Sequence, residues 1–148
     1  MMFSTDDGRL GVIIIPAGTP HMYQFQLVVD GFVLGDCEPC IIGSAMKRLS
    51  SLKKLSDARL SPGALSTDAL ISLLSTDSEL HDAATLSLAE SMDNWLLRAY
   101  KYEDLVVFVG REYRPVEGLP RTIFSVLDET SYDTIIEAAG SYMRENDE

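Results

Sequence analysis

The feature that most constrains the fold is the dipeptide Asp30-Gly31, which stands between two short apolar segments. Residues 22–29 place Tyr23, Phe25, Leu27 and Val29 on one face, with the period of two that is typical of a half-buried strand. Aspartate and glycine tolerate the positive φ angles of a type I′ turn, so the dipeptide predicts a hairpin that returns through residues 32–34. The β-branched residues 12–15 predict another strand before it.

Helical patterns follow the hairpin. Pro39 suits the first turn of a helix, and apolar residues from Ile42 to Leu52 recur at helical spacing, which predicts a helix over residues 39–55. Two shorter helices are expected over residues 69–74 and 77–86. The second follows Thr76-x-x-Glu79, a capping-box pattern.

The second half of the chain returns to strands, at residues 95–101, 105–109 and 122–127, and the sequence predicts a closing helix capped through Thr130-x-x-Asp133 with a frayed tail over residues 145–148. Residues 111–120 are expected to form a loop. Strands and helices that cluster in this way favour the α+β class. We therefore expect an antiparallel sheet of about five to six strands with helices packed on it, in a single domain that spans residues 1–148.

The charge balance narrows the choice of partner. Twelve Lys and Arg face 23 Asp and Glu, which gives a formal net charge of −11 and a pI of about 4.5. This balance disfavours nucleic acid and anionic membranes as partners. It is compatible with two roles, attraction of a basic protein partner or simply keeping the domain in solution. The acidic N-terminus lacks the basic region of a signal peptide, so we expect a cytoplasmic protein with reduced thiols.

Two hypotheses compete for Cys37-x-Pro-Cys40. At a helix start such a pair resembles the redox motif of thioredoxin-like oxidoreductases, because the helix dipole stabilises a thiolate. The predicted hairpin immediately upstream, where that fold has a parallel strand, and the distant Pro120 favour the alternative of two incidental thiols. A zinc site that combines the cysteines with His21 and His81 lacks a second half-site, so we expect no metal and no cofactor.

Acidic residues are concentrated between residues 68 and 104, against only Arg98 and Lys101. Two interpretations remain open: a surface that recognises a basic partner, or solvated helix ends, where carboxylates favour the first turn. The candidate partner-binding residues are Asp68, Asp77, Glu79, Asp82, Glu90, Asp93, Glu103 and Asp104.

The segment FQLVVDGFVLGDCEPCIIGSAMKRLSSL resembles immunity proteins of bacterial polymorphic toxin systems, including those of contact-dependent growth inhibition. The resemblance includes the DG turn, the following Gly35-Asp36, residues 40–43 and Leu49, and later the segment 91–95 and the closing strand and helix. It implies a non-enzymatic protein that binds and neutralises a cognate toxin domain, often a basic nuclease, and it carries over no catalytic residue. The alternatives are a thioredoxin-like oxidoreductase that uses Cys37 and Cys40, and a non-catalytic adaptor domain.

Overall fold

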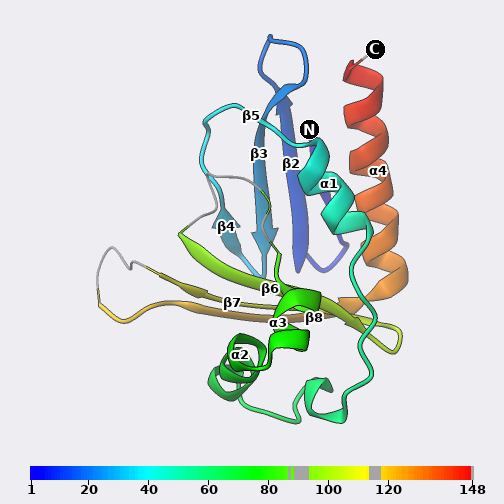
Figure 1. Ribbon diagram of the computed structural model, residues 1–148. Coiled ribbons are helices and arrows are strands. Elements are labelled where there is room, and N and C mark those ends of the chain that lie inside the picture. The colour runs from blue at the N-terminus through cyan, green and yellow to red at the C-terminus, as the bar shows by residue number, and fades with distance from the viewer. Residues whose placement is uncertain (87, 89–93, 114–117, 148) are drawn as a thin grey trace.

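The structure is a computed structural model that describes residues 1–86, 88, 94–113 and 118–147. It confirms the α+β class, with antiparallel strands and helices packed on them. The strands are divided between two sheets, which we call sheet A and sheet B. The strands of sheet A run crosswise to those of sheet B (Figure 1).

Sheet A contains the predicted hairpin. Its strands are β1 (Met2–Ser4), β2 (Leu10–Pro16), β3 (Met22–Val29), β4 (Phe32–Leu34) and β5 (Cys40–Ile41). They pair in the order β1-β2-β3-β4, and β5 pairs with the first residues of β3. The turn between β3 and β4 has φ angles of 50° at Asp30 and 86° at Gly31, as a turn with two positive φ angles requires.

Sheet B is a middle layer of the molecule. It contains β6 (Trp95–Tyr102), β7 (Leu105–Glu112) and β8 (Thr122–Asp128), all antiparallel. On β7, Val106 and Phe108 pack into the core shared with sheet A, whereas Val107 and Val109 pack into a second core on the opposite face. An apolar strand without alternation is buried on both faces, and this one is.

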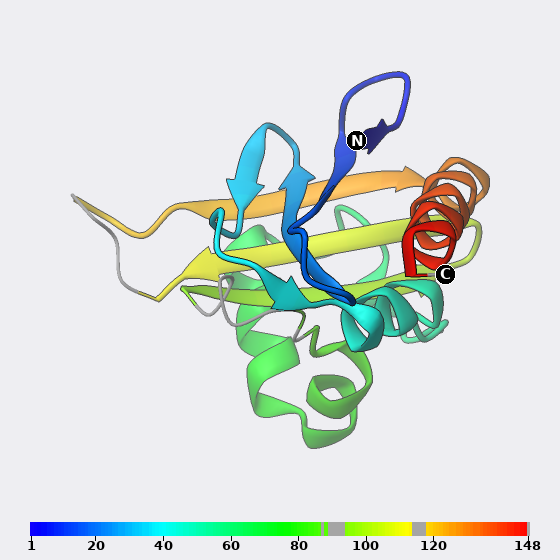
Figure 2. The ribbon, with the colours of Figure 1, turned by 90° about the horizontal axis from the view of Figure 1, so that it is seen from above.

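The helices cover the two sheets from different sides. The α1 (Gly43–Ser50) and α4 (Glu129–Asp147) helices pack into the core shared with sheet A, whereas α2 (Thr67–Thr76) and α3 (Ser78–Ala84) cover the outer face of sheet B. Figure 2 views α4 almost along its axis while the strands of sheet B run across the picture. Among the helices that the structure describes, none is both long enough and apolar enough to cross a membrane.

The helix predicted over residues 39–55 is wrong at both ends. The structure starts α1 at Gly43 and ends it at Ser50. Cys40 and Ile41 instead pair with Tyr23 and Met22 of β3, because the hairpin leaves that part of the edge of β3 open. Pro39 therefore precedes a strand, and the helical face contributes Ala45, Met46 and Leu49 to the core.

Three predicted helix ends also differ. The N-cap of α3 is Asp77, whose carboxylate accepts hydrogen bonds from the amides of Glu79 and Leu80, so Thr76 does not cap it. Asp128 accepts from the Ser131 amide at 2.8 Å, so α4 begins before Thr130. Residues 145–147, expected to fray, remain helical. At the two N-termini, a carboxylate one or two residues from the predicted cap accepts the hydrogen bonds. At the C-terminus, the carboxylate of Asp147 is held by Tyr23.

Candidate protein-interaction surface

The structure brings four of the eight candidate acidic residues onto one layer. Asp68, Asp77, Glu79 and Asp82 belong to α2, α3 and the link between them. Glu103 and Asp104 lie apart from them, in the turn between β6 and β7 (Figure 1). Glu90 and Asp93 lie outside the described residues.

The four carboxylates of the α2–α3 layer differ in how much of their charge is compensated. Asp68 pairs with Arg111 of β7 at 2.6 Å, although its side chain remains 75% exposed. Asp77 lies 3.9 Å from Arg59, whose closer partner is Asp57 at 2.7 Å. Hydrogen bonds from Arg59 lower the pKa of the Asp57 carboxyl to about 2. Residues 66–86 contain no lysine or arginine, so the α2–α3 layer is negative.

The two cysteines do not have the helix-start arrangement that the redox hypothesis assumed. Cys37 is an exposed thiol in the connection after β4, and Cys40 is half-buried in β5. Cys37 is a free thiol, and α1 begins three residues beyond Cys40. The helix-dipole argument for a stabilised thiolate therefore does not apply to either cysteine. Within the described residues, no cluster of three or more His, Cys, Asp and Glu side chains is placed to hold a metal ion.

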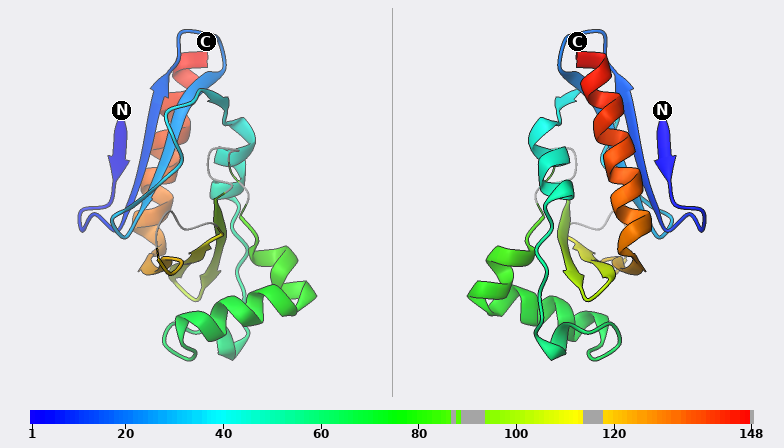
Figure 3. Two further views of the ribbon diagram at one scale, coloured as in Figure 1. Left: turned by 90° about the vertical axis from the view of Figure 1, so that its left-hand side faces the viewer. Right: turned by 90° about the vertical axis from the view of Figure 1, so that its right-hand side faces the viewer.

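A surface that the sequence analysis did not single out lies on sheet A. Directly paired residues of neighbouring strands point to the same face, so the registers define two faces. One face carries Val12, Phe25 and Leu27 into the core beneath α1 and α4. The right-hand view of Figure 3 shows both helices on that side of sheet A, and no described helix on the other.

We call the opposite side the open face. Along each strand, its residues alternate with those that point into the core. They are Met2, Ser4, Gly11, Ile13, Ile15, Met22, Gln24, Gln26, Val28, Val33 and Ile41. None of them is charged, and seven are large and apolar. Met2 is 55% exposed, Ile15 43%, Val33 55% and Ile41 72%. Antiparallel sheets with one solvated face usually alternate apolar inward and polar outward, and this sheet departs from that pattern.

Apolar side chains from three strands meet at one end of the open face. The Met2 Cε atom lies 2.9 Å from the point that a Cβ at Gly11 would occupy, and the Val28 Cβ lies 3.5 Å from the same point. Glycine at this position therefore lets the Met2 side chain reach across β2 toward β3. Met2 and Val28 therefore meet over Gly11, and Val33 is paired with Val28, whereas Gln24 and Gln26 separate this group from Met22 and Ile41 at the other end of the face.

Three of the connections that border sheet A are acidic, whereas residues 17–21, between β2 and β3, contain no Asp or Glu. Five exposed carboxylates lie in the turn between β1 and β2, the turn between β3 and β4, and the connection from β4 to β5, and we call them the acidic rim: Asp6, Asp7, Asp30, Asp36 and Glu38. Arg9 is the one Lys or Arg side chain in residues 1–46. It lies 3.5 Å from Asp7 and donates to the carbonyl of Val126 at 2.7 Å. A hydrogen bond from Thr5 and one from the Arg9 amide lower the pKa of Asp7, so this carboxyl stays charged.

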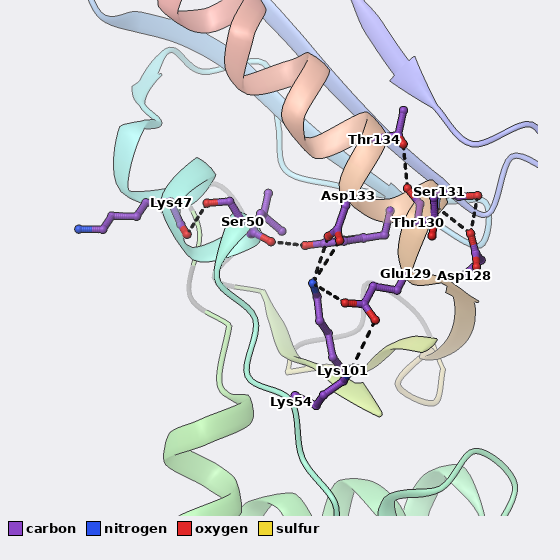
Figure 4. Close-up of polar contacts among 12 residues, drawn as sticks. Lys47, Ser50, Lys54, Lys101, Asp128, Glu129, Thr130, Ser131, Asp133 and Thr134 are labelled. Atoms are coloured by element: carbon purple, nitrogen blue, oxygen red, sulfur yellow. Dashed lines mark hydrogen bonds and ion pairs between the residues drawn. The ribbon is translucent and has the colours of Figure 1, made fainter. Parts of the chain in front are cut away.

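A polar cluster between α1, α4 and sheet B has a structural role. Lys101 Nζ lies 3.2 Å from Glu129 Oε1 and 3.1 Å from Asp133 Oδ1, and its side chain is 16% exposed (Figure 4). Burial disfavours the charged amine, but the bonds to Asp133 and Glu129 outweigh it and raise the pKa of Lys101. The adjoining hollow of about 530 Å³ is lined by both helices. The cluster attaches α4 to β6.

A second polar cluster joins the two sheets. Arg121 donates to both carboxylate oxygens of Glu112 at 2.8 Å, and its guanidinium lies 5.5 Å from the ring centre of Phe32 and 5.7 Å from that of Trp95. Phe32 belongs to sheet A and Trp95 to sheet B. Glu112 is 3% exposed, and the hydrogen bonds from Arg121 lower its pKa to about 2.

One sequence signal could have pointed to the open face. Residues 10–29 form a run without a single Asp, Glu, Lys or Arg, in a chain of which 24% is charged. Two paired strands taken from such a run have uncharged residues on both faces, although only one face can be in the core. The alternation of residues 22–29 identified the core face and left the other face unexplained.

Comparisons of the chain with protein-family models, with curated proteins and with solved structures find no match.

Proposed function

We propose that this protein is a non-enzymatic immunity protein of the cytoplasm, which binds and neutralises a cognate toxin domain. The toxin domain that we propose is a basic nuclease. The observation that carries the proposal is the negative α2–α3 layer, on which Asp68, Asp77, Glu79 and Asp82 lie together with no lysine or arginine in residues 66–86. A basic substrate-binding cleft is drawn to such a protein, because opposite fields accelerate encounter.

The net charge of −11 supports the same proposal. A domain that binds nucleic acid needs a positive surface, and a negative protein competes for that surface by resembling the substrate in charge. Binding alone is then sufficient for neutralisation, because an occupied cleft excludes the substrate. No catalytic group on this protein is required.

The test is a titration against the product of the gene immediately upstream. We expect a one-to-one complex with a submicromolar Kd in low salt and loss of the toxin's activity at the same molar ratio. Calorimetry measures the first quantity and a nuclease assay the second. No complex at micromolar concentrations in low salt would contradict the proposal, and a complex that leaves the toxin fully active would favour an adaptor.

A further inference from the structure

We infer that the open face of sheet A is the surface on which the toxin domain docks, and that the acidic rim selects a basic partner around an apolar contact. This inference rests on the proposed function and deepens it by naming the surface. It assigns the direct contact to the open face, while the α2–α3 layer contributes to the negative field that attracts a basic partner.

The centre of the open face is uncharged and largely apolar. Exposed contiguous apolar patches on a folded domain mark interaction sites, whereas single exposed apolar residues do not. Val33 of β4 and Ile41 of β5 lie along the same edge of β3, beside Val28 and Met22, and the register of Gln24 and Gln26 separates them. Uncharged residues thus extend from β1 to β4 and β5 without interruption. The centres of protein interfaces are depleted in charge in the same way.

The charge of the acidic rim distinguishes between two possible partners of the open face. A second copy of this chain would bring its own acidic rim against the first, so five carboxylates on each side would repel. A basic folded domain with an apolar patch has the opposite charge at the rim and matches the centre. The combination of an apolar centre and a charged rim therefore favours the basic toxin domain over self-association.

The area of the open face is smaller than that of a standard protein interface. The five strands of sheet A contain 23 residues in all, which at about 3.4 Å per residue and about 4.8 Å between strands give a face of roughly 400 Å². A standard interface buries about 800 Å² on each partner. The open face supplies the centre of such an interface, and the acidic rim is needed to complete it.

The experiment introduces a positive charge on the open face. Val33→Lys and Ile41→Lys each place a lysine at a position that is already more than half exposed, so neither disturbs the core. A cation buried in an apolar contact costs binding free energy, and we expect Kd for the toxin domain to rise about 30-fold or more for each variant. Titration calorimetry at one fixed salt concentration measures the change.

Two controls separate this inference from the proposed function. Leu119→Lys adds the same charge at an exposed leucine outside sheet A, and Asp82→Lys reverses a charge on the α2–α3 layer. Both are expected to change Kd less than fivefold. Normal binding by the open-face variants, together with loss of binding by Asp82→Lys, would overturn the inference and leave the proposed function standing. Failure of the unaltered protein to bind would overturn both.

A second measurement needs no substitution. Cys37 is an exposed thiol within the acidic rim, between Asp36 and Glu38. We expect its alkylation by a maleimide, followed by mass spectrometry, to slow at least tenfold in the complex. An unchanged rate in a saturated complex, or a dimer in sedimentation of the free protein that Val33→Lys dissociates, would also overturn the inference.

Discussion

Glu112 and Arg121 form a charged pair in which the carboxylate is inside and the guanidinium outside. Glu112 is 3% exposed and Arg121 59%. The carboxylate also accepts from the Arg121 amide at 2.9 Å, which makes three donors from one residue. Residues 111–120 were expected to form a loop, but Glu112 is the last residue of β7 and pairs with Trp95. The burial of its carboxylate depends on Arg121, the residue before β8.

Glu112→Gln is expected to lower the free energy of unfolding at pH 7, and the deficit is expected to shrink in acid. The pKa of Glu112 is about 2 in the folded protein, against an ordinary value of 4.5. A depressed folded pKa stabilises the protein above pH 4.5, and this contribution disappears as pH falls toward 2. Urea titrations of both proteins at pH 7, 4 and 3 measure the difference. A deficit independent of pH, or an equal effect of Glu79→Gln, would contradict the linkage.

Gly110 is a glycine that the packing of sheet B requires. A Cβ at this position would lie 3.0 Å from the backbone carbonyl oxygen of Leu96 and 3.3 Å from Leu97 Cδ1. Backbone cannot move aside as a flexible side chain does. We expect Gly110→Ala to lower the free energy of unfolding by about 1–3 kcal/mol, as overpacking does. Thermal and urea denaturation measure the change.

Gly43 provides the matched comparison for Gly110. A Cβ at Gly43, the first residue of α1, has no atom within 4 Å. We expect Gly43→Ala to leave the free energy of unfolding unchanged or to raise it by up to about 1 kcal/mol, because alanine favours a helix. Equal destabilisation by the two substitutions would show that contact with Leu96 does not set the cost at Gly110.

At the scale of elements, α4 is held along its length by contacts to three parts of the chain. Near its start, Lys101 of β6 binds Glu129 and Asp133. The buried Tyr132 hydroxyl donates to the carbonyl of Leu49, at 2.6 Å, and so attaches α4 to α1. At its end, the Tyr23 hydroxyl donates to the carboxylate of Asp147. These contacts explain why α4 continues to Asp147 rather than fraying at residue 145.

Lys101 and Lys54 test how α4 is attached, because both lysines lie beside Glu129. Lys101→Met removes a half-buried cation with two partners, and we expect a loss of about 1–3 kcal/mol in the free energy of unfolding. Lys54 is 60% exposed and lies 3.8 Å from Glu129. Lys54→Met is therefore expected to change the free energy of unfolding by only about 0.5 kcal/mol. Urea denaturation of both variants measures the contrast. Equal losses would contradict the role of burial.

At the scale of the whole molecule, the charge of −11 sets how fast a basic partner is met. The association rate constant with the toxin domain is expected to fall about 10- to 100-fold between roughly 0.01 M and 0.3 M salt, because screening shortens the reach of the field. Stopped-flow fluorescence measures the rate. The dissociation rate is expected to change less, since an apolar centre is not screened. A rate constant that salt does not alter would contradict electrostatic steering.

Local patterns were sufficient for six of the eight described strands and for most helix positions, but not for β1 or β5. The period of two over residues 22–29 and the Asp30-Gly31 turn predicted β3, β4 and their pairing, since a hairpin closes between neighbours in the chain. The apolar residues 105–109 predicted β7 in the same way. The ends of helices were less predictable, because several carboxylates and hydroxyls compete to cap each one. The candidate acidic residues that the structure describes lie on the helices and the turn where they were expected. Their role in binding stays a prediction.

The sequence by itself determined where six of the eight described strands lie, that the class is α+β, and that the protein is strongly negative. Only the tertiary structure decided that the strands form two sheets, that β5 rather than a helix follows Pro39, and that one face of sheet A is left uncovered. The reason is physical: alternation divides a strand into two faces, but which face is buried depends on where α1 and α4 pack. The α4 helix is distant in the chain from β2 and β3, and no local pattern records its contact with them.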